Sequence, residues 1–379
     1  MKLLKTLVAA AALTLGTAAH ADITVGAILS LTGPTSALGI PAQNELKLWP
    51  DTIAGQKLKV VILDDATDPS QGVKNARRLI TEDKVDVLLG SVTTPVAAAI
   101  AGVATENQIV QLAISPVALP PGKDGWTFRM PQSTDVMSLP IIEHWKKTGV
   151  KTYGFLGYTD AYGEAWLKSI APLAEKAGIK QVAVERFARS DTSVTGQALK
   201  IMAANPDAVL VVASGSGAAM PHRGLVERGY PQGKIYQTHG AATMDLIRVG
   251  GAAVEGSYVV SGPAVVADKL PASNASKKLG ERYIAEYEKV YGKGSANQFA
   301  AHLFDTYIVL EKAIPIAMKK AQPGTPEFRS ALKEALETMG RTPVSQGVLS
   351  WTAEDHFGFL PETGVLLKVV KGNWAVVSD

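Results

Sequence analysis

The chain alternates short apolar runs with longer segments of helical character, and it does so twice in succession. The first series has apolar runs at residues 23–29, 58–63, 85–89 and 109–114, with helix-like segments at 70–82 and 95–106. The second series extends from residue 152 to residue 238 in the same manner. Strands that alternate with helices form parallel sheets with both faces covered. The pattern therefore predicts an α/β chain with two doubly wound, Rossmann-like lobes.

The last third of the chain has a different character. Residues 272–339 are mostly of helical composition, and residues 347–377 contain three runs typical of antiparallel strands. Neither segment is large enough to form a domain alone, so each is expected to complete one of the two lobes. The chain would then pass between the lobes more than once, which is typical of a hinge.

The first 21 residues have the pattern of a secretory signal peptide. Lys2 and Lys5 precede an apolar stretch at residues 7–15, and Ala19-His20-Ala21 is a typical cleavage site. The stretch is too short to span a bilayer, and a buried N-terminal helix is the less favoured alternative. The chain has no cysteine, which excludes disulfides, thiol catalysis, thiolate metal sites and a lipid-anchored cysteine. We therefore expect an unanchored protein of the bacterial periplasm.

The charge balance gives no indication of a polyanionic partner. Removing Lys2 and Lys5 with the first 21 residues, which hold no acidic residue, lowers the formal net charge from +3 to about +1. No basic block with interleaved aromatic residues is present. We therefore expect no nucleic-acid partner.

Sequence motifs for catalysis, cofactors and metals are weak or missing. Gly215-Ser216-Gly217 begins like a dinucleotide fingerprint, but Met220 occupies the third glycine position and no acid follows about twenty residues on. The acids at positions 64, 65 and 68 precede Pro69 and fit turn and helix-cap roles better than a cation site. The histidines lack the spacing of metal ligands. We expect no catalytic residue, no cofactor and no metal, and a nicotinamide-dependent enzyme remains a distant alternative.

The turns at the carboxyl ends of the predicted strands share one composition. They lie at residues 31–39, 90–95, 115–121, 158–164, 213–219 and 238–242, and are rich in Gly, Ser, Thr and Pro. Ligands of open α/β sheets bind at these ends, and a catalytic site needs a positioned acid, base or metal. The turn GSVTTP (90–95) opens a helix and holds no lysine or arginine. Free amides at a helix start stabilise one carboxylate, so we predict a weakly charged acid as ligand.

Several segments together resemble the type I periplasmic binding proteins of ABC importers, in the branched-chain amino acid (Leu/Ile/Val)-binding group. The segments are ADITVGAILSLTGPTSALG, LDDATDPSQGVKNARRLI, GSVTTPVAAAIAGVA, ISP and TDAYGE. The resemblance implies two lobes joined by three crossings that close over a small ligand, and delivery to membrane permease subunits. It predicts lobe I at residues 22–138 and 264–341, lobe II at 139–263 and 342–379, and a monomer. A ligand-sensing receptor of the same fold is the alternative.

The resemblance also assigns roles to individual residues. It places the hydroxyl of Thr94 on the ligand carboxylate, with amides of the same turn, which includes Thr93. Leu38 is an apolar contact, the loop at Ser115 and Pro116 is a wall, and Tyr162 faces the head group. The simpler roles are a helix N-cap for Thr94, before Pro95, and packing within the lobe for Tyr162.

The chain departs from the amino acid binders where they hold the α-ammonium. His239 stands in place of their carboxylate, and a neutral histidine is a poor partner for an ammonium group. Ser214 and Gly215 replace an aromatic residue and enlarge the pocket, and Leu119 lies near the usual hydroxyl. We therefore expect a carboxylate without an α-amino group, such as an aromatic or other bulky apolar acid, with a polar substituent toward His239 or Tyr162. Three further lining candidates are Trp126, Phe299 and His302, and Asp245 is an alternative partner for an ammonium group.

Overall fold

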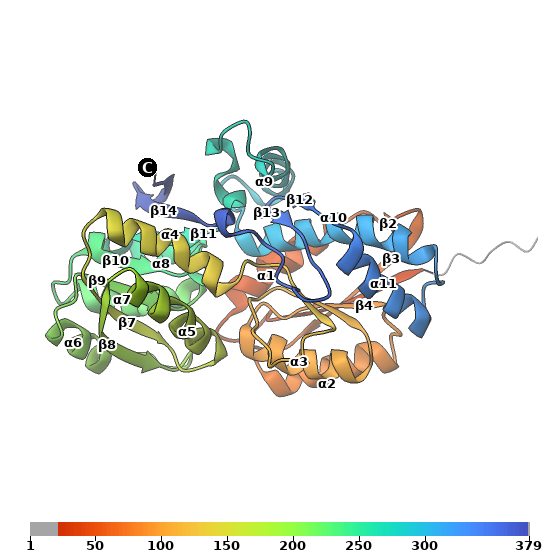
Figure 1. Ribbon diagram of the computed structural model, residues 1–379, viewed down its shortest axis with the longest axis horizontal. Coiled ribbons are helices and arrows are strands. Elements are labelled where there is room, and N and C mark those ends of the chain that lie inside the picture. Colours follow the sequence, from red (N-terminus) through yellow and green to blue (C-terminus); the bar gives the residue numbers. More distant parts are fainter. Residues whose placement is uncertain (1–21, 378–379) are drawn as a thin grey trace, which may run out of the picture.

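The computed structural model describes residues 22–377 and shows two α/β lobes side by side (Figure 1). The predicted signal peptide, residues 1–21, lies outside the described residues. Each lobe has its own sheet with helices packed against it. The predicted fold class is confirmed.

The sheet of lobe I has the strand order β2-β3-β1-β4-β5-β6. Its strands are β1 (Ile23–Leu29), β2 (Thr52–Ile53), β3 (Gln56–Asp64), β4 (Val87–Gly90), β5 (Val110–Ala113) and β6 (Thr127–Arg129). All pairs are parallel except that of β2 with β3. Residues of β4 and β5 are buried throughout, which explains why β4 is a continuous apolar run rather than an alternating one.

Helices cover both faces of this sheet. The helices of this lobe are α1 (Ser36–Leu46), α2 (Pro69–Thr81), α3 (Thr94–Glu106), α9 (Lys277–Tyr291), α10 (Gln298–Met318) and α11 (Pro326–Thr338). On one face α2 packs with α3, and on the other α1 and α11 pack against α10 (Figure 1).

The acidic residues at and after the end of β3 bind nearby main-chain groups. Asp68 caps α2 by accepting from Gln71 N (2.9 Å), and Asp64 accepts from Leu31 N (2.9 Å). The predicted turn and cap roles are confirmed.

The sheet of lobe II has the order β15-β14-β11-β10-β9-β7-β8. Its strands are β7 (Thr152–Tyr158), β8 (Lys180–Phe187), β9 (Ala208–Val212), β10 (Ile235–Gln237), β11 (Tyr258–Ser261), β14 (Val365–Val370) and β15 (Asn373–Val376). Strands β7 to β11 are parallel, and β14 and β15 add an antiparallel edge. The helices are α4 (Thr134–Lys147), α5 (Ala161–Lys176), α6 (Thr195–Ala203), α7 (Ala219–Val226) and α8 (Met244–Gly250). Helix α4 packs on α5, whereas α7 packs on both α6 and α8.

The chain passes between the lobes three times, after β6, after β11 and after the hairpin of β12 (Thr342–Val344) and β13 (Gly347–Leu349). The predicted ranges differ from this path at two points. Residue 138 lies inside α4, whose buried side chains belong to the core of lobe II. The hairpin was expected in lobe II, but Val344 and Leu349 pack in the core of lobe I.

The two lobes place equivalent points of their sheets toward each other. In lobe I the strand order reverses between β1 and β4, and in lobe II between β7 and β9; such reversals open a crevice for ligands. The helix after the first strand of each lobe lies against the end of that strand, and a side chain at Gly39 or Gly163 would collide with the backbone of Ser30 or Tyr158. Leu38 and Tyr162, one residue before each glycine, therefore occupy corresponding positions.

Candidate functional site

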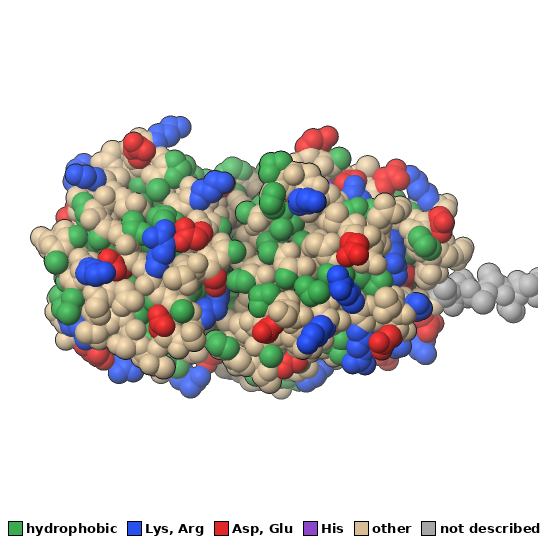
Figure 2. Space-filling view, turned by 90° about the horizontal axis from the view of Figure 1, so that it is seen from below, with side chains coloured by type: hydrophobic (Ala, Val, Ile, Leu, Met, Phe, Trp, Pro, Cys, Tyr) green, Lys and Arg blue, Asp and Glu red, His purple; other side chains and the backbone are tan. Residues whose placement is uncertain are grey.

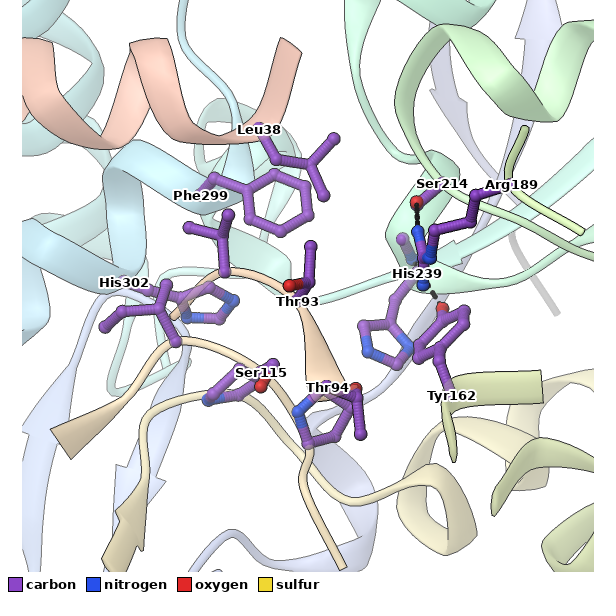
Figure 3. Close-up of a pocket in the computed structure, with 15 residues that line it drawn as sticks. Leu38, Thr93, Thr94, Ser115, Tyr162, Arg189, Ser214, His239, Phe299 and His302 are labelled. Carbon is purple, nitrogen blue, oxygen red and sulfur yellow. Dashed lines mark hydrogen bonds between the residues drawn. The ribbon is translucent and has the colours of Figure 1, made fainter. Parts of the chain in front are cut away.

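A cavity lies between the carboxyl ends of the two sheets. Its apolar wall consists of Leu38, Val92, Ile114, Pro116, Pro131 and Phe299. Its other lining residues are Thr93, Thr94, Ser115, Tyr162, Arg189, Ser214, His239, Gly240 and His302 (Figure 3). Both lobes contribute, and Thr94 and His239 are only 2% and 3% exposed. The lobes therefore bury this space as they would bury a ligand.

The lobe I end of the cavity is the start of α3. Thr93 is the N-cap, Thr94 the first helical residue and Pro95 the second, so the N-cap role considered for Thr94 is wrong by one position. The Thr94 hydroxyl has no hydrogen-bond partner among the described residues. The first N–H groups of a helix also lack an intrahelical acceptor. This end thus offers donors to an anion.

Buried polar groups fix the turn before α3 by hydrogen bonds. Ser91 Oγ donates to Asp65 Oδ2 (2.6 Å) and accepts from Thr93 N (3.3 Å). Burial raises the pKa of Asp65. From the side, Gln111 Nε2 donates to the carbonyl of Gly90 (2.7 Å). Hydrogen bonds within the protein thus hold this turn.

The loop after β5 forms a second wall of lobe I. Ser115 Oγ, like the Thr94 hydroxyl, has no partner within the described part of the chain. Arg129 fixes the loop by donating from Nε to the carbonyl of Val117 (2.9 Å). Leu119 does not line the cavity; it packs beside Val117. Ser115 therefore supplies the hydroxyl of this loop.

Tyr162 lines the cavity with its ring, but its hydroxyl is committed elsewhere. It donates to Thr238 Oγ1 (2.9 Å) and accepts from Gly240 N (3.0 Å). Burial raises the pKa of Tyr162 to about 12, so the phenol stays protonated. The hydroxyl thereby fixes the segment that carries His239.

His239 is the buried polar group of that segment. Neither of its ring nitrogens has a partner among residues 22–377. Its ring packs against the rings of Tyr162 and Trp166, with centroids 5.7 and 5.5 Å apart. Burial lowers the pKa of His239 to about 3, so the imidazole is neutral at physiological pH.

His302, which enters the cavity from α10, is a second neutral imidazole. Burial, with a smaller effect of His239, lowers the pKa of His302 to about 3. Its Nδ1 has no partner within the described residues. The two histidines can donate and accept hydrogen bonds but carry no charge.

Arg189 is a charged residue of the described lining that the sequence analysis missed. Its Nε donates to Asp160 Oδ2 (2.5 Å), its Nη1 donates to Ser214 Oγ (2.8 Å), and its guanidinium lies 4.1 Å from the ring centre of Tyr158. The cavity is therefore not free of cations, although Asp160 offsets this charge. The turn after β8 also lies at the carboxyl end of a strand, so the rule applied to the other turns could have found it.

Three predicted residues lie elsewhere. Gly215 (φ +52°) does not line the cavity but abuts α1 of lobe I, where a Cβ atom would lie 2.7 Å from a methyl group of Leu38. Trp126 packs under Lys333. Asp245 pairs with Arg248 (2.5 Å) and is not part of the lining. The described lining residues include no aspartate or glutamate.

Other site types find no support in the described part of the chain. It holds no cluster of His, Asp and Glu suited to a metal ion. None of its helices combines the length and apolar character needed to cross a membrane. On the face that Figure 2 shows, acidic and basic side chains are interspersed.

Residues 22–372 match the family model described as periplasmic binding protein. The chain belongs to this family. Its curated relatives include a Leu/Ile/Val-binding protein homolog of Brucella melitensis, 27% identical over 297 residues that cover 72% of this chain and 76% of the relative. This periplasmic binding protein is therefore of the branched-chain amino acid type found in ABC transporters, which binds solutes and is not an enzyme. The predicted family is confirmed.

Solved structures show the same relationship. An extracellular ligand-binding receptor of Rhodopseudomonas palustris is 46% identical, with a TM-score of 0.92 over 94% of this chain and all of the other. A solute-binding protein of an R. palustris ABC transporter, solved in complex with benzoate, is 20% identical, with a TM-score of 0.79 over 94% and 96% of the two chains. The second likeness concerns the fold alone.

Proposed function

We propose that this protein captures a small carboxylate without an α-ammonium group between its two lobes and passes it to the permease subunits of an ABC importer. It would do so as a monomer in the periplasm, after removal of residues 1–21. The ligand class proposed is an aromatic or other bulky apolar acid.

The observation that carries this proposal is the chemistry around His239. An α-ammonium group buried in a closed site needs an anionic partner or several acceptors. The described lining offers no carboxylate: neither Asp160 nor Asp245 is part of it, and each is paired with an arginine. His239 and His302 are neutral, and Arg189 would repel a cation.

The remaining lining suits an acid with an apolar body. The carboxylate would accept hydrogen bonds from the Thr94 and Ser115 hydroxyls and the free amides of α3, where the helix dipole also favours negative charge. The apolar body would lie among Leu38, Ile114 and Phe299. A polar substituent would face the neutral histidines.

The relatives point to two ligand classes. The benzoate complex shows that this fold can hold an aromatic acid without an α-ammonium group. The curated relatives are named for leucine, isoleucine and valine. The lining of this chain favours the first class.

Calorimetric titration tests the proposal. Ligand-free protein would be titrated with leucine, isoleucine, valine, benzoate and cinnamate, and native mass spectrometry of the protein as purified would identify any retained ligand. We expect an aromatic acid to bind more tightly than any of the three amino acids. Tight leucine binding without binding of either aromatic acid would refute the proposed ligand class.

A further inference from the structure

A buried side chain connects the two lobes behind the cavity. Gln298, the first residue of α10 in lobe I, donates from Nε2 to the main-chain carbonyl of His239 in lobe II. Its Oε1 accepts from Ser261 Oγ at the end of β11 (3.4 Å). Gln298 and Ser261 are 1% and 0% exposed. One amide group of lobe I therefore contacts two strand ends of lobe II.

Further buried groups hold the backbone of Gln298 in place. Gln346, in the turn between β12 and β13, donates from Nε2 to the Gln298 carbonyl (3.4 Å). The turn is itself anchored on α10, because Asp305 accepts from Ser345 N (2.6 Å) and Gln346 N (3.0 Å). These contacts lie within lobe I and do not depend on the position of lobe II.

Gln346 also contacts two of the crossings between the lobes. Gln132 Nε2, in the first crossing, donates to the Gln346 carbonyl (2.7 Å), and Ala264 N, after the second, donates to Gln346 Oε1 (3.5 Å). A side chain at Gly262 would collide with the Gln346 amide. The first two crossings thus pack against Gln346, which in turn binds the main chain of Gln298.

We infer that Gln298 is an interlobe latch, whose hydrogen bond to the His239 carbonyl forms on lobe closure and sets the fraction of protein in the closed arrangement. The bond joins separate lobes, and an interaction present in one state only shifts the equilibrium toward that state. It also fixes the backbone of a residue whose ring lines the cavity. Gln298 is therefore a positioning residue, and this role does not depend on which acid binds.

Interlobe distances in ligand-free protein test the latch. The chain has no cysteine, so Lys74→Cys on α2 and Lys168→Cys on α5, both exposed, give two unique positions for spin labels. Protein unfolded, dialysed and refolded to remove any retained ligand would be measured by double electron–electron resonance. In Gln298→Met we expect the ratio of closed to open protein to fall about threefold to tenfold, the typical worth of one hydrogen bond.

Two further variants make the test specific. Gln298→Glu keeps the acceptor for Ser261 and places a favourable acid at a helix start, but it removes the donor facing His239, so we expect the same loss of closed protein. Gln232→Ala removes a hydrogen bond that the side-chain amide donates to the Ala252 carbonyl (2.9 Å) within lobe II. This variant should leave the interlobe distances unchanged. Distance distributions of both Gln298 variants that superimpose on the wild type would overturn the inference, even if the variants melt at lower temperature. Failure of the proposed ligand class would instead appear only in calorimetry.

Discussion

The two halves of the cavity treat their polar groups differently. In lobe I the hydroxyls of Thr94 and Ser115 have no partner among the described residues, while Asp65 and Arg129 hold their loops from outside. In lobe II the hydroxyl of Tyr162 and the guanidinium of Arg189 are bonded to neighbours, whereas the ring nitrogens of His239 have no partner among the described residues. An unpartnered buried donor is costly until a ligand satisfies it. We therefore assign ligand capture to lobe I and the shape of the closed site to lobe II.

Thr94→Ala should have the largest effect on binding. It removes a donor to the carboxylate, and a hydrogen bond to a charged group is worth enough to raise Kd by about 10- to 100-fold. Calorimetry with the tightest-binding acid of the panel measures this. Thr94→Ser keeps the hydroxyl and should stay within about threefold of the wild type. An unchanged Kd in Thr94→Ala would remove Thr94 from the site.

Tyr162→Phe should have a smaller effect, through shape rather than direct contact. It leaves Gly240 N and the Thr238 hydroxyl without their partner, so we expect Kd to rise about tenfold. Tyr153→Phe is the matched control, because it loses a hydrogen bond with Gln181 in the same lobe away from the cavity. If both variants bound like the wild type, lobe II would not act through this hydroxyl.

Lobe I should lose stability in alkaline solution. Burial, with nearby Glu286, raises the pKa of Glu45 on α1 from 4.5 to about 8. The folded state then holds a proton that the unfolded chain has released, so stability falls as pH rises from about 4.5 through 8. Melting temperature measured from pH 6 to pH 9 should decline, and Glu45→Gln should flatten the profile. Equal slopes for both proteins would contradict this.

Lobe II should respond in the opposite direction, and His222 is one of the buried histidines that contribute. Burial lowers the pKa of His222 from 6.5 to about 4. The unfolded chain takes up a proton first, so stability falls as pH drops from about 6.5 through 4. Thermal melts of His222→Gln and of wild-type protein between pH 7 and pH 4 test this. A His222→Gln profile as steep as that of the wild type would assign the acid loss to other groups.

Local patterns in the sequence predicted the strands and the turns that follow them. The apolar runs correspond to β1, β3, β4 and β5, and eight of the nine predicted binding residues line the cavity. Their contact with a ligand stays a prediction. These features depend on burial and on the rule that strand ends meet, both of which are visible in short segments.

The features that were missed depend on contacts between distant residues. The Tyr162 hydroxyl binds Gly240, 78 positions away, and Gln298 reaches His239 across the lobe boundary. Arg189 enters the cavity because Asp160 and Ser214 direct its side chain there. No local pattern of apolar and polar residues encodes such pairings. The hairpin of β12 and β13 was assigned to the wrong lobe for the same reason.

Gly39 and Gly163 allow the helix after the first strand of each lobe to lie against that strand, and this has a consequence for how selectivity can change. The residue before each glycine is leucine on one side and tyrosine on the other, so the same backbone device presents two different surfaces. Substitution of Leu38 or Tyr162 alters the cavity wall of one lobe and leaves the wall of the other lobe intact. If both residues contact the ligand as predicted, the two ends of a molecule would be recognised by separate positions on an unchanged scaffold.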